Sequence, residues 1–247
     1  MGMSVHAEAT GRVVVTGGSS GIGEGIVRRL HGDGYAVVNL DIQAPKPDAV
    51  GQFLQVDLGD AAATQAVLAA VLADGPVTRL VNNVGIVWPQ PVGEVSLENV
   101  ERSLAVNLRS AFLCFQALLP GMQAAGFGRV VNISSRTLMG KELRTTYGMS
   151  KGGLLAATRT WALEFAQQGI TVNAIGPGPI NTELFQKGNP PGDPRTDAIL
   201  RSVPMRRFGE PAEVAHAVAS LLDARAGFIT GQILYVCGGQ AVGVQAA

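Results

Sequence analysis

The sequence contains few cysteines and histidines. Cys114 and Cys237 are its only cysteines, and they do not have metal-ligand spacing. The histidines His6, His31 and His216 are scattered, and none begins the HExxH pattern of zinc enzymes. We therefore expect no metal centre, and two free thiols of the kind found in a reducing cytoplasm.

An excess of one charge and long hydrophobic runs are missing as well. Lys+Arg and Asp+Glu both number 19, so the net charge offers no broad attraction for nucleic acid or an anionic membrane. No apolar run approaches the ~20 residues of a membrane span, and the N-terminal MGMSVHAEATG lacks the features of a signal peptide. We expect a cytoplasmic protein with a flexible tail over 1–11 and no nucleic-acid or membrane partner.

Strand-like and helix-like segments alternate from residue 12 onward. Short apolar runs predict strands and segments with helical spacing predict helices. Because the strands are apolar on both faces and helices separate them, we expect a mostly parallel sheet covered on both sides, in a single α/β domain over 12–247. The expected strands are 12–16, 35–41, 53–57, 78–83, 128–134, 170–178 and 233–237, and the helices are 21–34, 60–75, 97–126, 145–169 and 211–223.

The segment 179–210 interrupts the alternation of strand-like and helix-like segments. It is rich in proline, glycine and charge, and a loop of this length in a compact domain is usually a lid or a binding loop. We predict that it is a substrate loop.

A glycine-rich turn, TGGSSGIG (16–23), follows the first strand and opens a helix. In this context glycines let the backbone approach a pyrophosphate, and the helix N-terminus supplies free N–H groups. A plain strand-to-helix turn is the alternative. The residues expected to hold the cofactor here are Gly17, Ser19, Ser20, Gly21, Ile22 and Gly23.

Two aspartates follow the next strands. Asp41 ends VVNLD, where a carboxylate can accept both ribose hydroxyls of adenosine and would repel a 2′-phosphate. Because no arginine or lysine lies in the glycine turn, we expect NAD rather than NADP. Asp57, with Leu58 beside it, is expected to bind the adenine, and the alternative for Asp57 is a cap on the helix that follows.

Tyr147 and Lys151 stand four residues apart and share one face of a helix. An ammonium at this distance is expected to lower the pKa of the phenol, which could then exchange a proton with an alcohol or carbonyl oxygen. Ser134 and Ser135 end the preceding strand. In an open parallel sheet, strand ends and helix starts meet at the ligand site.

These motifs together resemble the short-chain dehydrogenase/reductase family over about 12–240. The matching motifs are TGGSSGIG (16–23), NNVG (82–85), VNL (106–108), NISS (132–135), YGMSK (147–151) and NAIGPGPINT (173–182). The resemblance implies a Rossmann-type, doubly wound sheet, hydride transfer between a nicotinamide cofactor and an alcohol or carbonyl, and a homotetramer or homodimer. It also implies a catalytic tetrad formed by Asn107, a serine, Tyr147 and Lys151.

The resemblance also assigns roles to single residues. Lys151 would bind the nicotinamide ribose as well as tune Tyr147, and Asn107 would anchor a water, or else be a helix-kink residue. Asn83 would support the central strand near the adenosine. Further cofactor contacts are expected from Gly85, Pro177, Gly178, Ile180 and Thr182.

The resemblance leaves two candidates for the serine. The family's usual spacing before the tyrosine points to Ser134, whereas the NISS motif points to Ser135. Neighbours in a strand face opposite ways, so both cannot point into the site. We favour Ser135, because the sheet fixes strand register while loops absorb deletions.

The substrate is less defined. Arg136 and Arg144 could bind an anionic group, or simply face solvent, while Trp88 and Met139 could form an apolar wall. The leading hypothesis is an NAD-dependent oxidoreductase acting on a small secondary alcohol or ketone. The alternatives are an NADPH-dependent 3-oxoacyl-carrier-protein reductase and a non-catalytic dinucleotide-binding regulator.

Overall fold

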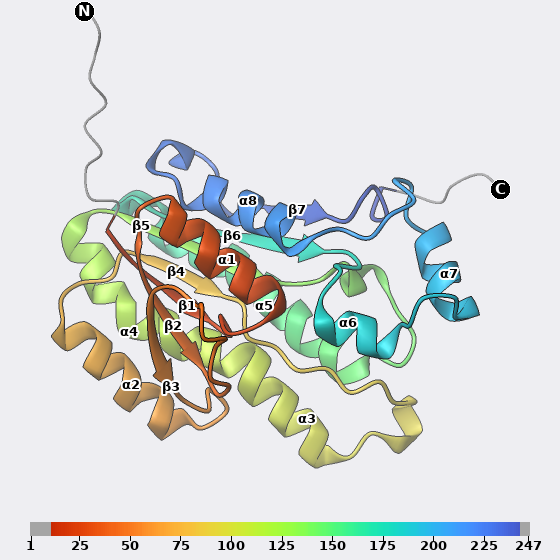
Figure 1. Ribbon diagram of the computed structural model, residues 1–247. Coiled ribbons are helices and arrows are strands. Elements are labelled where there is room, and N and C mark those ends of the chain that lie inside the picture. Colours follow the sequence, from red (N-terminus) through yellow and green to blue (C-terminus); the bar gives the residue numbers. More distant parts are fainter. Residues whose placement is uncertain (1–10, 243–247) are drawn as a thin grey trace, which may run out of the picture.

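A computed structural model describes residues 11–242, so most of the expected tail and residues 243–247 of the expected domain lie outside the described residues. Seven parallel strands form one sheet in the order β3-β2-β1-β4-β5-β6-β7 (Figure 1). The strand order reverses between β1 and β4, which places a crevice at the carboxyl ends of these strands. The strands are β1 Arg12–Thr16, β2 Ala36–Asp41, β3 Gln52–Gln55, β4 Arg79–Asn82, β5 Gly128–Ile133, β6 Ile170–Pro177 and β7 Ile233–Val236.

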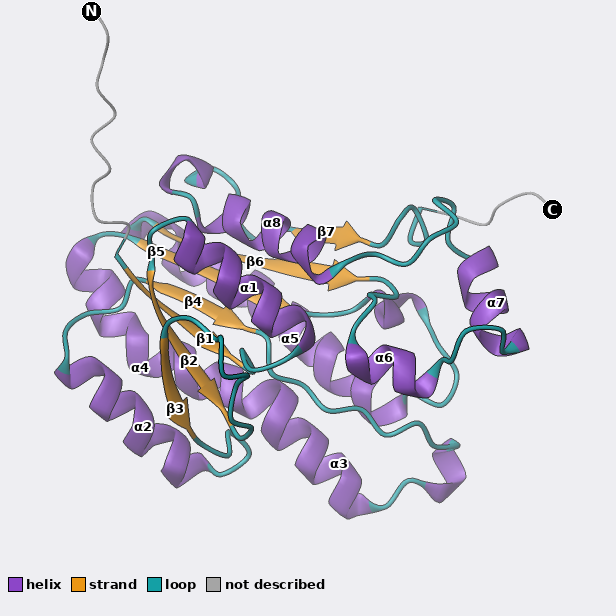
Figure 2. Ribbon diagram, in the orientation of Figure 1, coloured by secondary structure: helices purple, strands orange, loops and turns teal. Residues whose placement is uncertain are grey.

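Helices cover both faces of the sheet (Figure 2). They are α1 Gly21–Gly32, α2 Ala61–Ala73, α3 Leu97–Leu104, α4 Ser110–Ala125, α5 Thr145–Phe165, α6 Glu183–Gly188, α7 Pro194–Arg201 and α8 Pro211–Leu222, with short helical turns at Val92–Glu94, Arg136–Met139, Ala166–Gln168 and Ala224–Ala226. The predicted α/β fold, one doubly wound parallel sheet with helices on both faces, is confirmed.

The side chains of β1 point alternately to the two faces of the sheet, and each face carries its own layer of the core. Val13 and Val15 pack toward α1 and α8, whereas Val14 packs on the opposite face with α2, α4 and α5. Strands buried on both faces are the reason that the sequence reads as continuous apolar runs instead of an alternating pattern.

The helical stretch from Leu97 to Ala125 is long and apolar enough, by length and composition alone, to cross a membrane. Within it, Cys114, Leu118 and Met122 recur every four residues and are fully buried in the core. A core helix accounts for this composition.

The segment 179–210 differs from the expected loop, because it contains α6 and α7. Thr182 caps α6 by accepting from the Phe185 N–H, and Asp193 caps α7 by accepting from the Arg195 N–H. The prolines and glycines of this segment favoured a loop prediction, and two helices of six and eight residues were therefore missed.

Candidate active site

The glycine turn between β1 and α1 is held by two asparagines. The Asn39 carboxamide accepts from the Gly18 N–H at 2.8 Å and donates to the Ser19 hydroxyl at 3.0 Å. Asn83 donates to the Gly17 carbonyl at 2.8 Å, which agrees with its expected supporting role. Sequence reasoning missed Asn39, although a polar residue inside the apolar run VVNLD was a visible signal.

The shape of this turn requires glycine. A Cβ on Gly23 would lie 1.9 Å from the Gly17 carbonyl oxygen, and Gly17 itself has a φ of +69°. The side chain of Ser20, the N-cap of α1, makes no capping hydrogen bond. The first N–H groups of α1 can therefore serve an anionic ligand, and the turn fits the pyrophosphate of a dinucleotide.

Asp41 lies at the end of β2, beside the turn. Its carboxylate is buried and accepts from the backbone N–H groups of Ser19 at 2.9 Å and Gln43 at 3.0 Å. These two bonds fix the carboxylate, and each oxygen still has a free acceptor position for a ribose hydroxyl.

Asp57 has a partner that sequence reasoning missed. Both of its oxygens accept from Arg102 at 2.9 Å, and one also accepts from the Gly59 N–H. Its alternative role as a helix cap is wrong, because Asp60 caps α2 by accepting from the Ala63 N–H. Leu58 is buried behind it. The adenine contact of Asp57 stays a prediction.

The two serines face different neighbours. Ser134 is buried, and its hydroxyl donates to the Lys151 carbonyl at 3.2 Å within α5. The Ser135 hydroxyl accepts from the Thr137 N–H at 3.1 Å and lies near Tyr147, whose pKa it lowers. Only Ser135 is therefore placed beside the phenol.

Burial dominates the electrostatics of Tyr147 and Lys151. Loss of hydration raises the pKa of Tyr147, an effect opposed by the Ser135 hydroxyl and the positive charge of Arg144. The expectation that Lys151 gives the phenol a lowered pKa is therefore wrong for this structure. Burial lowers the pKa of Lys151 itself to about 8. Its Nζ donates to the Ile133 carbonyl at 2.7 Å and lies 5.9 Å from the centre of the Tyr147 ring.

Asn107 sits in a π-helical turn, Ala105–Arg109, between α3 and α4. Its carboxamide accepts from the Ile86 N–H at 2.8 Å and donates to the Ile86 carbonyl at 2.9 Å. A π turn is a recurrent feature of functional sites. Asn107 is thus a helix-distortion residue, but its carboxamide bonds the segment after β4 instead of its own helix backbone, and it also donates to the Ser103 hydroxyl at 3.3 Å and the Ser150 hydroxyl at 3.0 Å. A Cβ on Gly85 would lie 3.2 Å from the Lys151 Nζ, so this segment also closes over the lysine.

The residues expected near the nicotinamide follow β6. Pro177 ends β6, and the Gly178 N–H donates to the Val236 carbonyl at 2.9 Å. Ile180 is buried, whereas Thr182 reaches toward the start of α1, where a Cβ on Gly21 would lie 3.2 Å from its methyl group. The structure thus brings this segment next to the glycine turn.

Among the expected substrate residues, Trp88 and Met139 expose large apolar side chains, whereas Arg136 and Arg144 are half-buried. Arg136 and Met139 belong to the short helical turn after β5, and Arg144 precedes α5.

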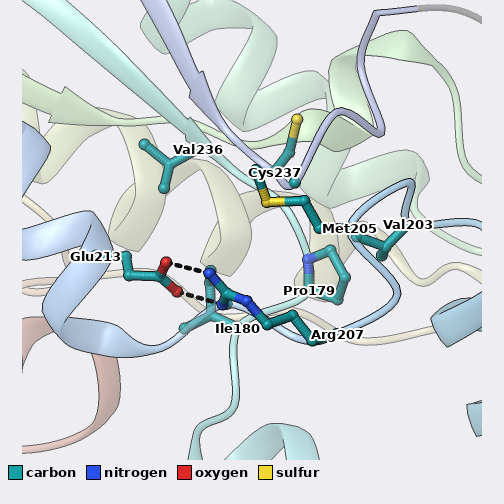
Figure 3. Close-up of a pocket in the computed structure, with 10 residues that line it drawn as sticks. Pro179, Ile180, Val203, Met205, Arg207, Glu213, Val236 and Cys237 are labelled. Atoms are coloured by element: carbon teal, nitrogen blue, oxygen red, sulfur yellow. Dashed lines mark hydrogen bonds and ion pairs between the residues drawn. The ribbon is translucent and has the colours of Figure 1, made fainter.

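A cavity of about 40 Å³ lies at the base of the substrate loop (Figure 3). Arg207 and Glu213 form a double hydrogen bond at its edge, with distances of 2.8 and 2.6 Å. Cys237, buried at its wall, is a free thiol. The volume suits one or a few waters and is too small for a substrate.

Comparison with known proteins agrees with this geometry. Residues 17–241 match a family model described as enoyl-(acyl carrier protein) reductase. The chain is 35% identical to the (2S)-[(R)-hydroxy(phenyl)methyl]succinyl-CoA dehydrogenase subunit BbsD of Thauera aromatica, covering 93% of this chain and 96% of that one. It is 34% identical to a 3-oxoacyl-[acyl-carrier-protein] reductase of Staphylococcus epidermidis, covering 92% and 97%.

A solved structure is similar over the same extent. Thermoplasma acidophilum aldohexose dehydrogenase in ligand-free form superposes with a TM-score of 0.89 at 30% identity, covering 96% of both chains. The chain belongs to the short-chain dehydrogenase/reductase family, whose members are oxidoreductases that bind nicotinamide dinucleotides and act on alcohol or carbonyl groups.

Proposed function

We propose that this protein is an NAD-dependent oxidoreductase that interconverts a secondary alcohol and a ketone. The observation that carries the proposal is the placement of Ser135, Tyr147 and Lys151 at the carboxyl edge of the sheet, on the same edge as the glycine turn. Ligands of open α/β sheets bind at this edge.

Tyr147 acts as the general acid in ketone reduction and as the general base in alcohol oxidation. The Ser135 hydroxyl, beside the phenol, holds and polarises the same substrate oxygen. When bound, the nicotinamide supplies or accepts the hydride. Lys151 binds the ribose, the Ser135 hydroxyl and the charge of Arg144 favour the phenolate form of Tyr147, and Asn107 fixes the Ile86 backbone.

Asp41 supports the choice of NAD. Its carboxylate is fixed next to the turn by the Ser19 N–H, and its charge disfavours a 2′-phosphate there. Lys46, which follows β2, is paired with Glu24 and Glu183. It is therefore not free to compensate that repulsion.

Two further inferences concern the protein's assembly and location. Phe112 on α4 and Leu163 on α5 are exposed, as are Phe228 and Leu234 at the β7 edge. We infer a homotetramer, or at least a homodimer, that covers these apolar side chains. The two free thiols support a cytoplasmic location.

The proposal is tested with a panel of secondary alcohols and ketones, monitored by nicotinamide absorbance with both cofactors. We expect turnover with NAD(H), and a loss of at least about 100-fold in kcat for Tyr147→Phe. Tyr35→Phe, which alters a core tyrosine stacked with Arg79, is the matched control and keeps its activity.

Each contrary result points to a different alternative. Activity that survives Tyr147→Phe, or no turnover with either cofactor, favours a non-catalytic dinucleotide-binding protein. Tighter binding of NADPH than of NADH contradicts the role of Asp41. Combined with turnover of 3-oxoacyl thioesters, it favours a reductase like the 34% identical relative from Staphylococcus epidermidis.

A further inference from the structure

Four basic side chains gather at the entrance to the candidate active site, and we call them the basic rim. Arg136 lies in the turn after β5, Lys141 in the following loop, Arg144 just before α5, and Arg195 on α7 of the substrate loop. All four interact electrostatically, because Arg136, Arg144 and Arg195 each lower the pKa of Lys141. Figure 1 shows α7 on the side of the molecule where the chain runs from β5 to α5.

The basic rim carries more positive than negative charge, although the Asp193 carboxylate accepts from the Arg195 backbone N–H at 2.7 Å. Within residues 11–242, no ion pair joins any of its members to a carboxylate, although six other basic residues there are paired. The carboxylate of Glu142 raises the pKa of Lys141, whereas burial and the three arginines lower the pKa of Lys141. Such a collection of like charges costs free energy, and an anion bound among them would offset that cost.

The basic rim is also next to the reacting group. Arg144 precedes Tyr147 by one helical turn, and its charge acts on the phenol. The backbone of Leu143, with a φ of +59°, is in the left-handed region. Its carbonyl accepts from the Gln90 N–H at 3.3 Å, which brings the chain that carries Trp88 alongside. Apolar surface and positive charge therefore meet at one entrance.

We propose that the substrate is an apolar alcohol or ketone that also carries an anionic group, a carboxylate or a phosphate, and that the basic rim binds this group while Tyr147 contacts the reacting oxygen. This inference rests on the proposed function, since it names the substrate class of that site. Arg144 binds the anion nearest to the reacting carbon, and Arg136 and Arg195 close around it. Trp88 and Met139 cover the apolar part.

The test compares 3-benzoylpropanoate with its methyl ester, which keeps the ketone and removes the charge. Binding is measured by the shift in thermal unfolding midpoint on ligand addition, and turnover by kcat/KM. We expect the acid to bind at least about tenfold more tightly than the ester, because a hydrogen-bonded charge pair contributes more than ~1.4 kcal/mol. Acetoacetyl-CoA is the phosphate-bearing arm, and a preference for it that the basic-rim substitutions below remove identifies the anion as a phosphate.

Three variants locate the effect. Arg136→Gln and Arg195→Gln are expected to reduce the preference for the anionic ligand by about tenfold while leaving the binding of the ester unchanged. Arg136 is half-buried in a short turn and Arg195 is exposed on α7, so folding should be retained. Arg159→Gln, which removes an exposed charge farther along α5, is the matched control and keeps the preference.

The outcomes separate the two proposals. Equal binding of acid, thioester and ester, or a preference that survives both basic-rim substitutions, overturns the role of the basic rim and leaves the oxidoreductase proposal intact. Binding of the acid without turnover of any alcohol or ketone overturns the oxidoreductase proposal, while the unfolding shifts still report on the basic rim.

Discussion

Lys151 shows most clearly how a single residue relates function to stability. It is 2% exposed, is among the largest fully buried side chains, and carries an amine that donates to the Ile133 carbonyl. Burying an ammonium costs hydration that one or two hydrogen bonds do not fully replace. Lys151 therefore lowers the stability of the fold, and its proposed role at the cofactor is the reason that we give for it.

We therefore expect Lys151→Met to be inactive and more stable. The pKa of Lys151 is about 8 in the folded protein, below its ordinary 10.5, so the penalty is fully present below pH 8 and fades as the pH rises toward 10.5. The substitution should raise the unfolding midpoint by roughly 2–4 °C at pH 6.5, with the gain shrinking toward pH 10. Thermal scans at fixed protein concentration measure this, and a gain that grows with pH contradicts the assignment.

The serine pair gives a second prediction at this scale. Ser135→Ala should lower kcat by about 100-fold with little loss of stability, because in the proposed mechanism its hydroxyl binds the reacting oxygen. Ser134→Ala should keep activity and lose about 1 kcal/mol of unfolding free energy, since its hydroxyl donates to the Lys151 carbonyl. Steady-state kinetics and urea unfolding of both variants decide the matter. The reverse pattern would make Ser134 the catalytic serine.

At the scale of elements, the turn between β1 and α1 depends on close backbone approach. Gly23→Ala would place a methyl group 1.9 Å from the Gly17 carbonyl oxygen. We expect it to abolish dinucleotide binding and to lower stability by more than about 1 kcal/mol. Protein fluorescence during titration with NADH measures the binding.

Gly32→Ala is the control within the same helix. Nothing lies within 4 Å of the added Cβ, so this change should raise stability by about 0.5 kcal/mol and leave binding intact. If both variants bind NADH normally, the turn does not hold the cofactor.

The elements also show what the sequence could and could not reveal. Buried strands such as Arg12–Thr16 can be predicted from the sequence, because burial on both faces gives continuous apolar runs. The salt bridge between Asp57 and Arg102 could not be predicted from the sequence, because 45 positions separate the two residues. The π turn around Asn107 could not be predicted either, because it depends on contacts with Ile86 that form only when the chain folds.

At the scale of the whole molecule, the exposed apolar side chains concern the assembly of several copies of the chain. Leu163 on α5 is 84% exposed and Phe228 is fully exposed, on elements that lie in different parts of the chain. Single exposed residues need no explanation, but the exposed apolar side chains on α4, on α5 and around β7 are the ones that the proposed tetramer would bury.

Leu163→Glu is expected to split the assembly. A charge at the proposed α5 interface should convert the proposed tetramer to a smaller species, because an unpaired buried carboxylate is costly. Leu97→Glu, at an exposed position on α3, should leave the mass unchanged. Light scattering coupled to size-exclusion chromatography measures both, and a monomeric unmodified protein contradicts the inference.

The base of the substrate loop is closed by main-chain bonds. Asn181 N–H donates to the Gly209 carbonyl at 2.7 Å, Gly209 N–H donates to the Pro179 carbonyl at 3.0 Å, and the Arg207–Glu213 pair fastens the second end to α8. Residues 183–206 therefore form an insert whose two ends are anchored by residues outside it, and Glu183, Ser202 and Met205 add contacts with Lys46, Gln240 and Gly238. The insert could be replaced by another sequence in a protein-engineering experiment. In evolution, the same replacement could change the proposed substrate specificity while the proposed cofactor site stays the same.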